Sequence, residues 1–148
     1  MRLWHKDLIS VLPRQQLLSQ WRECCCMARN IAVMGTPSHL LVNKILDYPI
    51  IYFYSYTKLV RDEMIRRGYK VNEELFLKHY RAFALRRYRD VGNAFVEVPS
   101  EHIFKDWHDE RYLKQCFYNL QEKYDCGGIS QAEWLKIDNY FKSKEITL

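Results

Sequence analysis

Residues 13–32 read PRQQLLSQWRECCCMARNIA, and the spacing of apolar residues in this stretch decides the fold class. Apolar side chains recur at steps of one, three, four and three residues, which is the spacing of one face of an α-helix. They are Leu17, Leu18, Trp21, Cys25 and Ala28. Pro13 suits the start of a helix, because a first helical position does not need a backbone N–H. We therefore predict a helix over residues 13–32.

The opposite side of this predicted helix is mostly polar and carries Gln16, Gln20, Glu23 and Met27. Because side chains on different faces of a helix point in different directions, we expect the Glu23 carboxylate to project away from the apolar face. A carboxylate in that position is available for proton transfer or for stabilising a cation. Taken alone, the pair of Arg22 and Glu23 is typical of a solvated surface.

Further helices are predicted by the same spacing over residues 51–67, 72–88 and 108–124, with Asn72 as the cap of the second of these. Ser130 and Glu133 have the spacing of a capping box and predict a last helix. Between these helices, the sequence GTPS at residues 35–38 predicts a loop that extends to residue 49. Residues 94–98 alternate weakly like a strand, and the same pattern fits an extended connection.

These elements predict an all-α protein, with residues 1–148 forming one compact domain of about four to five helices joined by long loops. The chain has 23 Lys and Arg against 18 Asp and Glu, and its net charge of +5 favours a polyanionic partner such as nucleic acid. No signal peptide is recognisable at residues 1–7, and the apolar run at residues 49–54 is too short to cross a bilayer. We therefore expect a cytoplasmic location and no membrane partner.

Cofactor and metal motifs do not occur in the sequence. The patterns GxGxxG, GxxxxGK[ST] and GxSxG are missing, and the histidines show no metal-ligand spacing. Three of the five cysteines are adjacent, at residues 24–26, and on a helix their side chains diverge by about 100° each. We expect reduced, packed thiols and no metal or other cofactor; Cys126 or a histidine completing a metal site with one of these thiols is the less favoured alternative.

Three blocks of sequence carry a resemblance to a known family. Residues 8–23 read LISVLPRQQLLSQWRE after an N-terminus that reads MRLWH, residues 64–69 read MIRRGY, and residues 119–123 read NLQEK. These blocks resemble the phage-type pyrimidine-dimer DNA glycosylases, the endonuclease V that acts on UV damage, and more closely its small bacterial members. The resemblance covers most of residues 1–124 and is strongest over the first 25.

The resemblance implies a compact, all-helical enzyme without a cofactor. In that family an N-terminal amine attacks C1′ of the damaged nucleotide, the base leaves through an imine, and β-elimination cuts the strand. Glu23 matches the family's catalytic carboxylate. An α-amino group titrates near about 8 and a lysine near about 10.4, so the terminus is the better nucleophile. Because Arg2 is bulky and normally leaves Met1 in place, we expect the Met1 amine to react, with Lys6 as the alternative amine.

The resemblance also suggests residues that contact DNA. Arg22 matches a phosphate contact of the family, Lys123 lies close to a basic position of its late helix, and Cys26 stands where the family has a second arginine. The full set of expected site residues is Met1, Arg2 and Glu23 for catalysis and Arg14, Gln16, Arg22, His39 and Lys123 for DNA binding. The expected partner is damaged double-stranded DNA, bound by a monomer.

Two other interpretations stay open at the level of sequence. The bulky Arg2 and the replacement at Cys26 are compatible with a non-catalytic DNA-binding or adaptor protein that keeps the fold. A thiol redox role for residues 24–26 requires an abnormally reactive thiol. The sequence does not distinguish a pyrimidine dimer from a ring-opened purine or an abasic site as the lesion.

Overall fold

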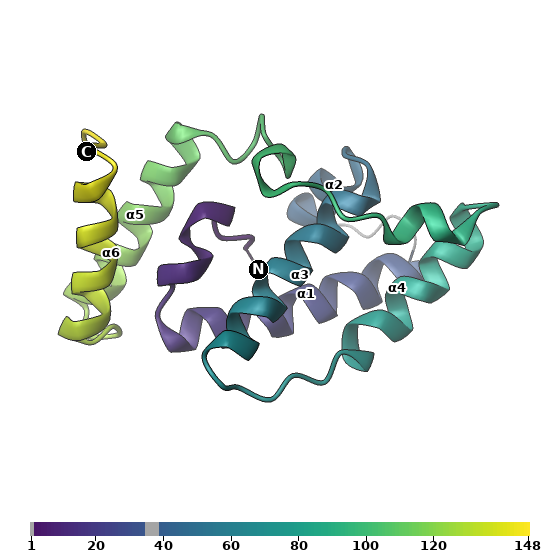
Figure 1. Ribbon diagram of the computed structural model, residues 1–148, viewed down its shortest axis with the longest axis horizontal. Coiled ribbons are helices and arrows are strands. Elements are labelled where there is room, and N and C mark those ends of the chain that lie inside the picture. Colours follow the sequence, from purple (N-terminus) through teal and green to yellow (C-terminus); the bar gives the residue numbers. More distant parts are fainter. Residues whose placement is uncertain (1, 35–38) are drawn as a thin grey trace.

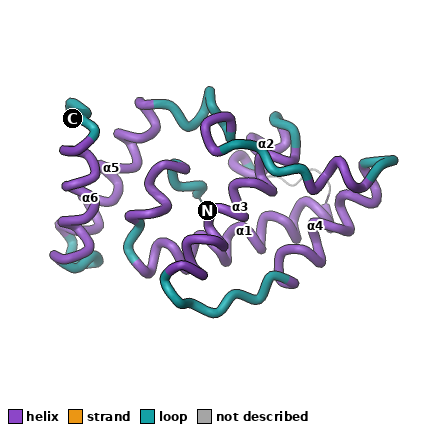
Figure 2. Tube along the Cα trace, in the orientation of Figure 1, coloured by secondary structure: helices purple, strands orange, loops and turns teal. Residues whose placement is uncertain are grey.

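The computed structural model describes residues 2–34 and 39–148, and all regular elements in these ranges are helices (Figures 1 and 2). Six α-helices and three short 3-10 helices occur there, more than the four to five helices expected from the sequence. In chain order they are η1 (Lys6–Val11), α1 (Arg14–Met34), α2 (Leu40–Leu46), α3 (Ile50–Arg66), α4 (Glu74–Arg87), η2 (Val91–Phe95), η3 (Ser100–His102), α5 (Glu110–Asp125) and α6 (Gln131–Ser143).

The largest difference from prediction is α2, which lies inside the stretch expected to be a loop. Its buried residues Val42 and Ile45 are one helical turn apart and anchor it to the core. A helix of seven residues shows too little periodicity to be recognised and is stabilised by packing rather than by its own propensity. The predicted break at residues 35–38 lies outside the described residues. The strand interpretation of residues 94–98 is wrong, because η2 ends at Phe95 and an extended connection follows it.

The helix ends follow the capping signals of the sequence. The Asn72 side chain accepts a hydrogen bond from the Glu74 N–H at 3.2 Å, although α4 begins two residues later than predicted. The capping box at the start of α6 is confirmed, since the Ser130 hydroxyl accepts from the Glu133 N–H and the Glu133 side chain accepts from the Ser130 N–H. Asp109 caps α5 by accepting from the Tyr112 N–H at 2.9 Å.

The faces of α1 differ from the predicted ones. Gln20 and Met27, expected on the polar side, are buried, whereas Leu18 and Cys25 are only partly buried. The physical reason is that α1 is covered on more than one side. It packs against α3 and α4, and the segment before η1 lies against Gln20. A single apolar stripe therefore underestimates how much of a central helix is buried.

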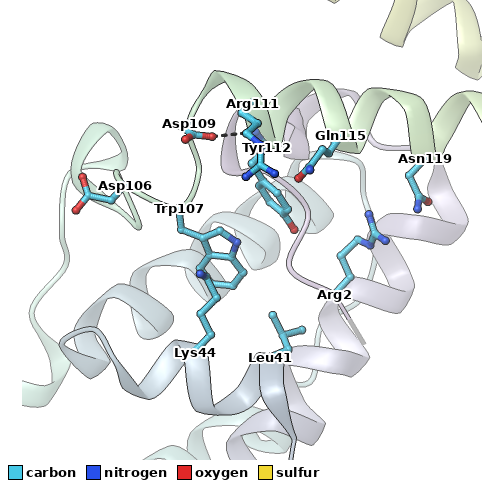
Figure 3. A pocket seen from close by; sticks show the side chains of 10 residues that line it. All are labelled: Arg2, Leu41, Lys44, Asp106, Trp107, Asp109, Arg111, Tyr112, Gln115 and Asn119. Atoms are coloured by element: carbon cyan, nitrogen blue, oxygen red, sulfur yellow. Dashed lines mark hydrogen bonds between the residues drawn. The ribbon is translucent and has the colours of Figure 1, made fainter.

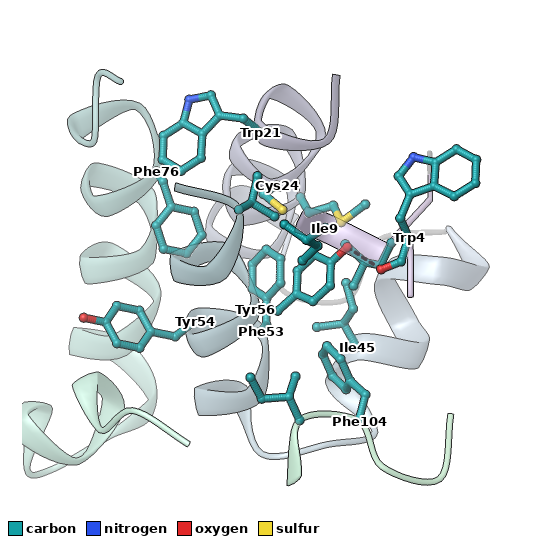
Figure 4. Packing of buried hydrophobic residues seen from close by; sticks show 14 of the residues in the cluster. Trp4, Ile9, Trp21, Cys24, Ile45, Phe53, Tyr54, Tyr56, Phe76 and Phe104 are labelled. Atoms are coloured by element: carbon teal, nitrogen blue, oxygen red, sulfur yellow. Dashed lines mark hydrogen bonds between the residues drawn. The ribbon is translucent and has the colours of Figure 1, made fainter. Parts of the chain in front are cut away.

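The core is centred on α3, whose Phe53 and Tyr56 lie between α1 and the loop that carries Phe104 (Figure 4). Trp21 packs against Phe76 of α4 and belongs to this core, as does Trp4. In Figure 1 the α5–α6 pair forms one end of the molecule, and the N-terminal segment lies between this pair and α3.

The α5–α6 pair is held by aromatic contacts. Phe117 meets Phe141 with ring centroids 4.6 Å apart, and Tyr124 stacks on Trp134 at 5.1 Å. The C-terminal aromatics are thus packing residues, as the helical spacing predicts. Among the described residues, no helix combines the length and the apolar composition needed to cross a membrane.

Candidate active site

The N-terminal segment enters the interior of the protein. Leu3, Trp4 and His5 are each less than one tenth exposed, which is unusual so close to a chain end. Because buried backbone groups need hydrogen-bond partners, other parts of the chain must supply them. Three side chains from three helices do so, and they hold the N-terminal segment in place.

Gln20 of α1 is the first of these side chains. Its Oε1 accepts from the Trp4 N–H at 2.8 Å, and its Nε2 donates to the Arg2 carbonyl at 2.8 Å. Gln20 is 1% exposed, and its hydrogen bond with the Trp4 N–H is buried whereas that with the Arg2 carbonyl is partly buried. The side chain therefore clamps the segment on both sides of Leu3.

Two tyrosines complete the clamp. The Tyr56 hydroxyl donates to the Trp4 carbonyl at 2.6 Å (Figure 4) and lies 3.1 Å from Gln20 Oε1. The Tyr112 hydroxyl donates to the Leu3 carbonyl at 2.6 Å. Burial raises the pKa of both phenols, so they stay protonated and remain donors. We use the name N-terminal clamp for Gln20, Tyr56 and Tyr112.

Glu23 lies one helical turn beyond Gln20 and meets the start of the segment. The backbone N–H of Arg2 donates to Glu23 Oε2 at 3.0 Å, and the carboxylate is partly exposed. Residues three apart on a helix share a face. Gln20 therefore bonds to the backbone of residues 2 and 4, and Glu23 bonds to the N–H of residue 2 from the same side of α1. The predicted carboxylate and the predicted N-terminal segment are thus adjacent.

A polar cavity of about 360 Å³ opens at the contact between Arg2 and Glu23, and we call it the Glu23 cavity. It is lined by Arg2, Trp4, Gln16, Ser19, Glu23, Asn119 and Lys123. Four residues expected from the sequence therefore lie together here, namely Arg2, Gln16, Glu23 and Lys123. The volume is in the range of small-ligand sites, and the lining mixes a carboxylate with cations and amides.

A second cavity, of about 620 Å³, adjoins the first and shares Arg2 and Asn119 with it (Figure 3). Its wall brings α2 and α5 together through the cations Lys44 and Arg111, and the Lys44 ammonium lies 5.3 Å from the centre of the Trp107 ring. Two carboxylates, Asp106 and Asp109, also line it. We call the two cavities together the site groove.

Of the other expected residues, Arg14 and His39 do not line the Glu23 cavity and Arg22 lies at its rim. Arg14 is exposed. Its backbone N–H donates to the Glu133 carboxylate at 2.8 Å, and its guanidinium lies 5.8 Å from the centre of the Tyr69 ring. His39 directly precedes α2 and lines neither cavity of the site groove. Arg22 is exposed and donates to the Ser19 hydroxyl at 3.2 Å, which places it at the rim of the cavity that Ser19 lines.

The alternative amine, Lys6, lies elsewhere. Burial lowers the pKa of its ammonium, but Nζ donates to the Ser100 carbonyl at 2.5 Å and lines neither cavity of the site groove. Arg67, in the block that resembles the family at residues 64–69, donates to the Leu12 carbonyl at 2.8 Å and to Glu63 at 2.7 Å. Its contacts fasten η1 to α3 and are structural.

Two of the three adjacent thiols, those of Cys24 and Cys25, are shifted away from the reactive thiolate form. Burial raises the pKa of Cys24 to about 12 and that of Cys25 to about 11, which disfavours the thiolates needed for redox chemistry. Among the described residues, no three His, Cys, Asp or Glu side chains are grouped to hold a metal ion. These cysteines therefore give no support to the redox interpretation.

Sequence reasoning missed the clamp and most of the wall of the site groove. Gln20 had the clearest signal, since it shares the polar side of the helix with Glu23. Tyr56 reads as an ordinary member of an apolar stripe and Tyr112 lies next to one, and their hydroxyl contacts join residues 52 and 109 positions apart. No local pattern reports such contacts.

A comparison with protein-family models places the chain among the DNA repair glycosylases. The matching model is that of the pyrimidine dimer DNA glycosylases, it covers residues 1–77, and the chain belongs to this family. The matched part contains η1, α1, α2 and α3, including Glu23 and two of the three residues of the N-terminal clamp. No curated protein and no solved structure matches the chain.

Proposed function

We propose that the chain excises pyrimidine dimers from duplex DNA and then cuts the strand, with its N-terminal amine as the nucleophile and Glu23 as the assisting carboxylate. The observation that carries this proposal is the 3.0 Å hydrogen bond between the Arg2 N–H and Glu23 at the Glu23 cavity. The family supplies the substrate class. The clamp explains why a chain end is held in this position.

The nucleophile in the 148-residue chain is the α-amine of Met1, which lies outside the described residues. The Arg2 nitrogen itself is a peptide nitrogen whose electron pair is delocalised, so it cannot attack. Consecutive Cα atoms are about 3.8 Å apart, so the Met1 amine is covalently tied within one residue of the Glu23 contact. An α-amine is also partly neutral at neutral pH, which a lysine is not.

The proposed reaction has two stages, release of the base and cleavage of the strand. The neutral amine forms a bond to C1′, the glycosidic C1′–N bond breaks, and the base leaves with the electron pair. Loss of a proton from nitrogen and opening of the C1′–O4′ bond with protonation of O4′ then give a protonated imine. Removal of a proton from C2′ expels the 3′ phosphate as the leaving group, and water hydrolyses the imine. Glu23 stabilises the cations and moves protons.

Binding of the duplex would depend on the cations along the site groove. Arg22 and Lys123 flank the Glu23 cavity, and Lys44 and Arg111 stand on the wall of the larger cavity. Such residues bind phosphates and release counterions. A glycosylase must also displace a base from the stack. The larger cavity is lined by an aromatic side chain and two amides that could contact a displaced base, namely Trp107, Gln115 and Asn119. We propose that a monomer acts in this way.

The test compares dimer-dependent strand cleavage by the wild type and by Glu23→Gln under single-turnover conditions. The amide keeps an acceptor for the Arg2 N–H but loses the charge, so we expect cleavage to fall by about 10² to 10³-fold with binding retained. Glu122→Gln is the matched control, because Glu122 is exposed on α5 and lines neither cavity of the site groove. Binding without cleavage by the wild type would support the non-catalytic DNA-binding alternative instead.

A further inference from the structure

The positive charge of this chain is concentrated outside the site groove. Residues 78–89 read KHYRAFALRRYR and hold five Lys and Arg and no Asp or Glu. The net charge of the whole chain is also +5, so the rest of the chain carries 18 cations against its 18 carboxylates. A number of cations equal to the whole excess of positive charge thus lies on α4 from residue 78 onward and on the two residues that follow the helix.

Most of these cations are free to meet a partner. Arg81 pairs with Glu74 on the same helix at 2.7 Å, and the other four, Lys78, Arg86, Arg87 and Arg89, are exposed and form no ion pair with the described residues. The carboxylate that follows, Asp90, accepts a hydrogen bond from the Gly92 N–H and caps η2. The apolar face of α4 is already covered by α1.

Helix stability alone does not account for this concentration. Cations in the last turn of a helix stabilise it through the helix dipole, and Arg86 and Arg87 occupy that turn. The effect falls off within one turn, so it does not require Lys78, and Arg89 lies beyond the helix end. The segment also begins immediately after the family match ends at residue 77, so the family match does not explain it.

The position of the segment connects it to the site groove through α2. Lys44 of α2 lines the larger cavity of the site groove, while its neighbour Asn43 lines a separate groove of about 510 Å³. Arg87 lines that second groove too, together with one carboxylate, Asp47. Helix α2 is therefore the shared wall, and Figure 1 shows it in the same half of the molecule as the end of α4. A helix is about 10–12 Å wide, which corresponds to roughly three base-pair steps of 3.4 Å.

We propose that residues 78–89 bind the phosphate backbone of the duplex on one side of the lesion, across α2 from the site groove. This rests on the proposed function, since it assumes that duplex DNA occupies the site groove. Exposed guanidinium groups suit phosphate, and they contribute affinity without reading sequence. The surface anchors flanking DNA and takes no part in the chemistry at Glu23.

The test measures the salt dependence of binding to an undamaged 20-base-pair duplex. In the triple variant Arg86→Gln, Arg87→Gln, Arg89→Gln, the slope of log K against log salt should become shallower by about 0.9 for each phosphate that the variant no longer binds, and affinity near 0.1 M salt should fall by about 10²-fold. The triple variant Lys70→Gln, Lys136→Gln, Lys144→Gln removes the same charge from exposed positions elsewhere and should change the slope much less.

Two further variants and measurements separate the possible failures. Replacing the same three arginines with lysine keeps the charge and should restore the slope, and thermal unfolding shows whether each variant is folded. Cleavage of a dimer by saturating enzyme should be unchanged in the glutamine variant. Equal slopes in the two glutamine triples, with cleavage intact, would overturn this inference alone. A wild type that neither binds nor cleaves damaged DNA would overturn the proposed function as well.

Discussion

At the scale of single residues, the unusual feature is the burial of a chain end by polar side chains. The N-terminal clamp supplies partners for the carbonyls of residues 2–4 and for the Trp4 N–H, and Glu23 accepts the hydrogen bond of the Arg2 N–H. A buried polar group is favourable only when it is hydrogen-bonded, so such an arrangement is costly to leave incomplete. The clamp therefore links stability to the position of the proposed nucleophile.

Gln20→Leu tests that link. The substitution leaves the Trp4 N–H and the Arg2 carbonyl without their partner, so we expect the free energy of unfolding to fall by about 2–3 kcal/mol. Misplacement of the terminus should lower single-turnover cleavage by about 10²-fold. Denaturant unfolding and cleavage assays measure the two effects. The control is Gln15→Leu at an exposed position of α1, and cleavage equal in both variants would show that the clamp does not position the nucleophile.

At the scale of elements, the fastening of the segment that leads into η1 depends on two neutral histidines. The Lys6 N–H donates to His108 Nδ1 at 2.9 Å, and His5 Nε2 donates to the His108 carbonyl at 2.8 Å. Burial lowers the pKa of His108 to about 2, with a smaller contribution from the nearby His5 ring and Lys6 ammonium, which disfavour a further positive charge there. Burial lowers the pKa of His5 as well, against the attraction of Asp7.

This predicts stability that is lost in mild acid. The unfolded histidines bind protons below about pH 6.5 while the folded ones stay neutral, so stability is full above that pH and declines as the pH falls toward the folded pKa. At pH 5 the loss from His108 is about 2 kcal/mol. Thermal unfolding from pH 7.5 to 5 checks this. His108→Asn, which keeps an acceptor for the Lys6 N–H, should be less stable at pH 7 and less sensitive to pH. An equally steep decline in the variant would contradict the assignment.

The capping box of α6 gives a second prediction at this scale. Ser130→Ala removes the acceptor of the Glu133 N–H and should lower the free energy of unfolding by about 1 kcal/mol. Ser143→Ala near the other end of α6 should change it by less than about 0.5 kcal/mol. Denaturant titration compares them, and a loss no larger for Ser130 than for Ser143 would count against the cap.

Elements with local signals were predictable, and those set by distant contacts were not. The start of α6 follows from Ser130 and Glu133, and α1, α3, α4 and α5 follow from apolar spacing. Helix α2 was missed because it is stabilised by two residues, Val42 and Ile45, that pack against parts of the chain distant in sequence. In the candidate site, Glu23 and the N-terminus were reached through a resemblance, whereas the clamp tyrosines depend on contacts across the fold.

At the scale of the whole molecule, two features with different origins meet in one proposed complex. The site groove lies where the N-terminal segment, α1, α2 and α5 come together, and the basic segment at residues 78–89 lies on α4 and just beyond it. The first would determine which nucleotide reacts, and the second would determine how firmly flanking DNA is held. The distinction predicts that chemistry and salt dependence can be changed separately.

Binding of the wild type to duplex DNA should therefore depend steeply on salt. Four cations in or at the rim of the site groove, Arg22, Lys44, Arg111 and Lys123, and three or four from residues 78–89 give an expected slope of about −6 to −7 in a plot of log K against log salt. Fluorescence anisotropy between about 50 and 200 mM salt measures it. Tight binding that barely changes over this range would contradict phosphate recognition at both surfaces.

The most direct measurement of the central claim is borohydride trapping on a duplex with a single pyrimidine dimer, followed by digestion and mass spectrometry of the adduct. We expect a reduced covalent bond between the DNA sugar and the α-amine of the peptide that begins with Met1. Acetylation of that amine should abolish the adduct, and Glu23→Gln should reduce it strongly. An adduct on Lys6, or none from protein that still binds the duplex, would contradict the account.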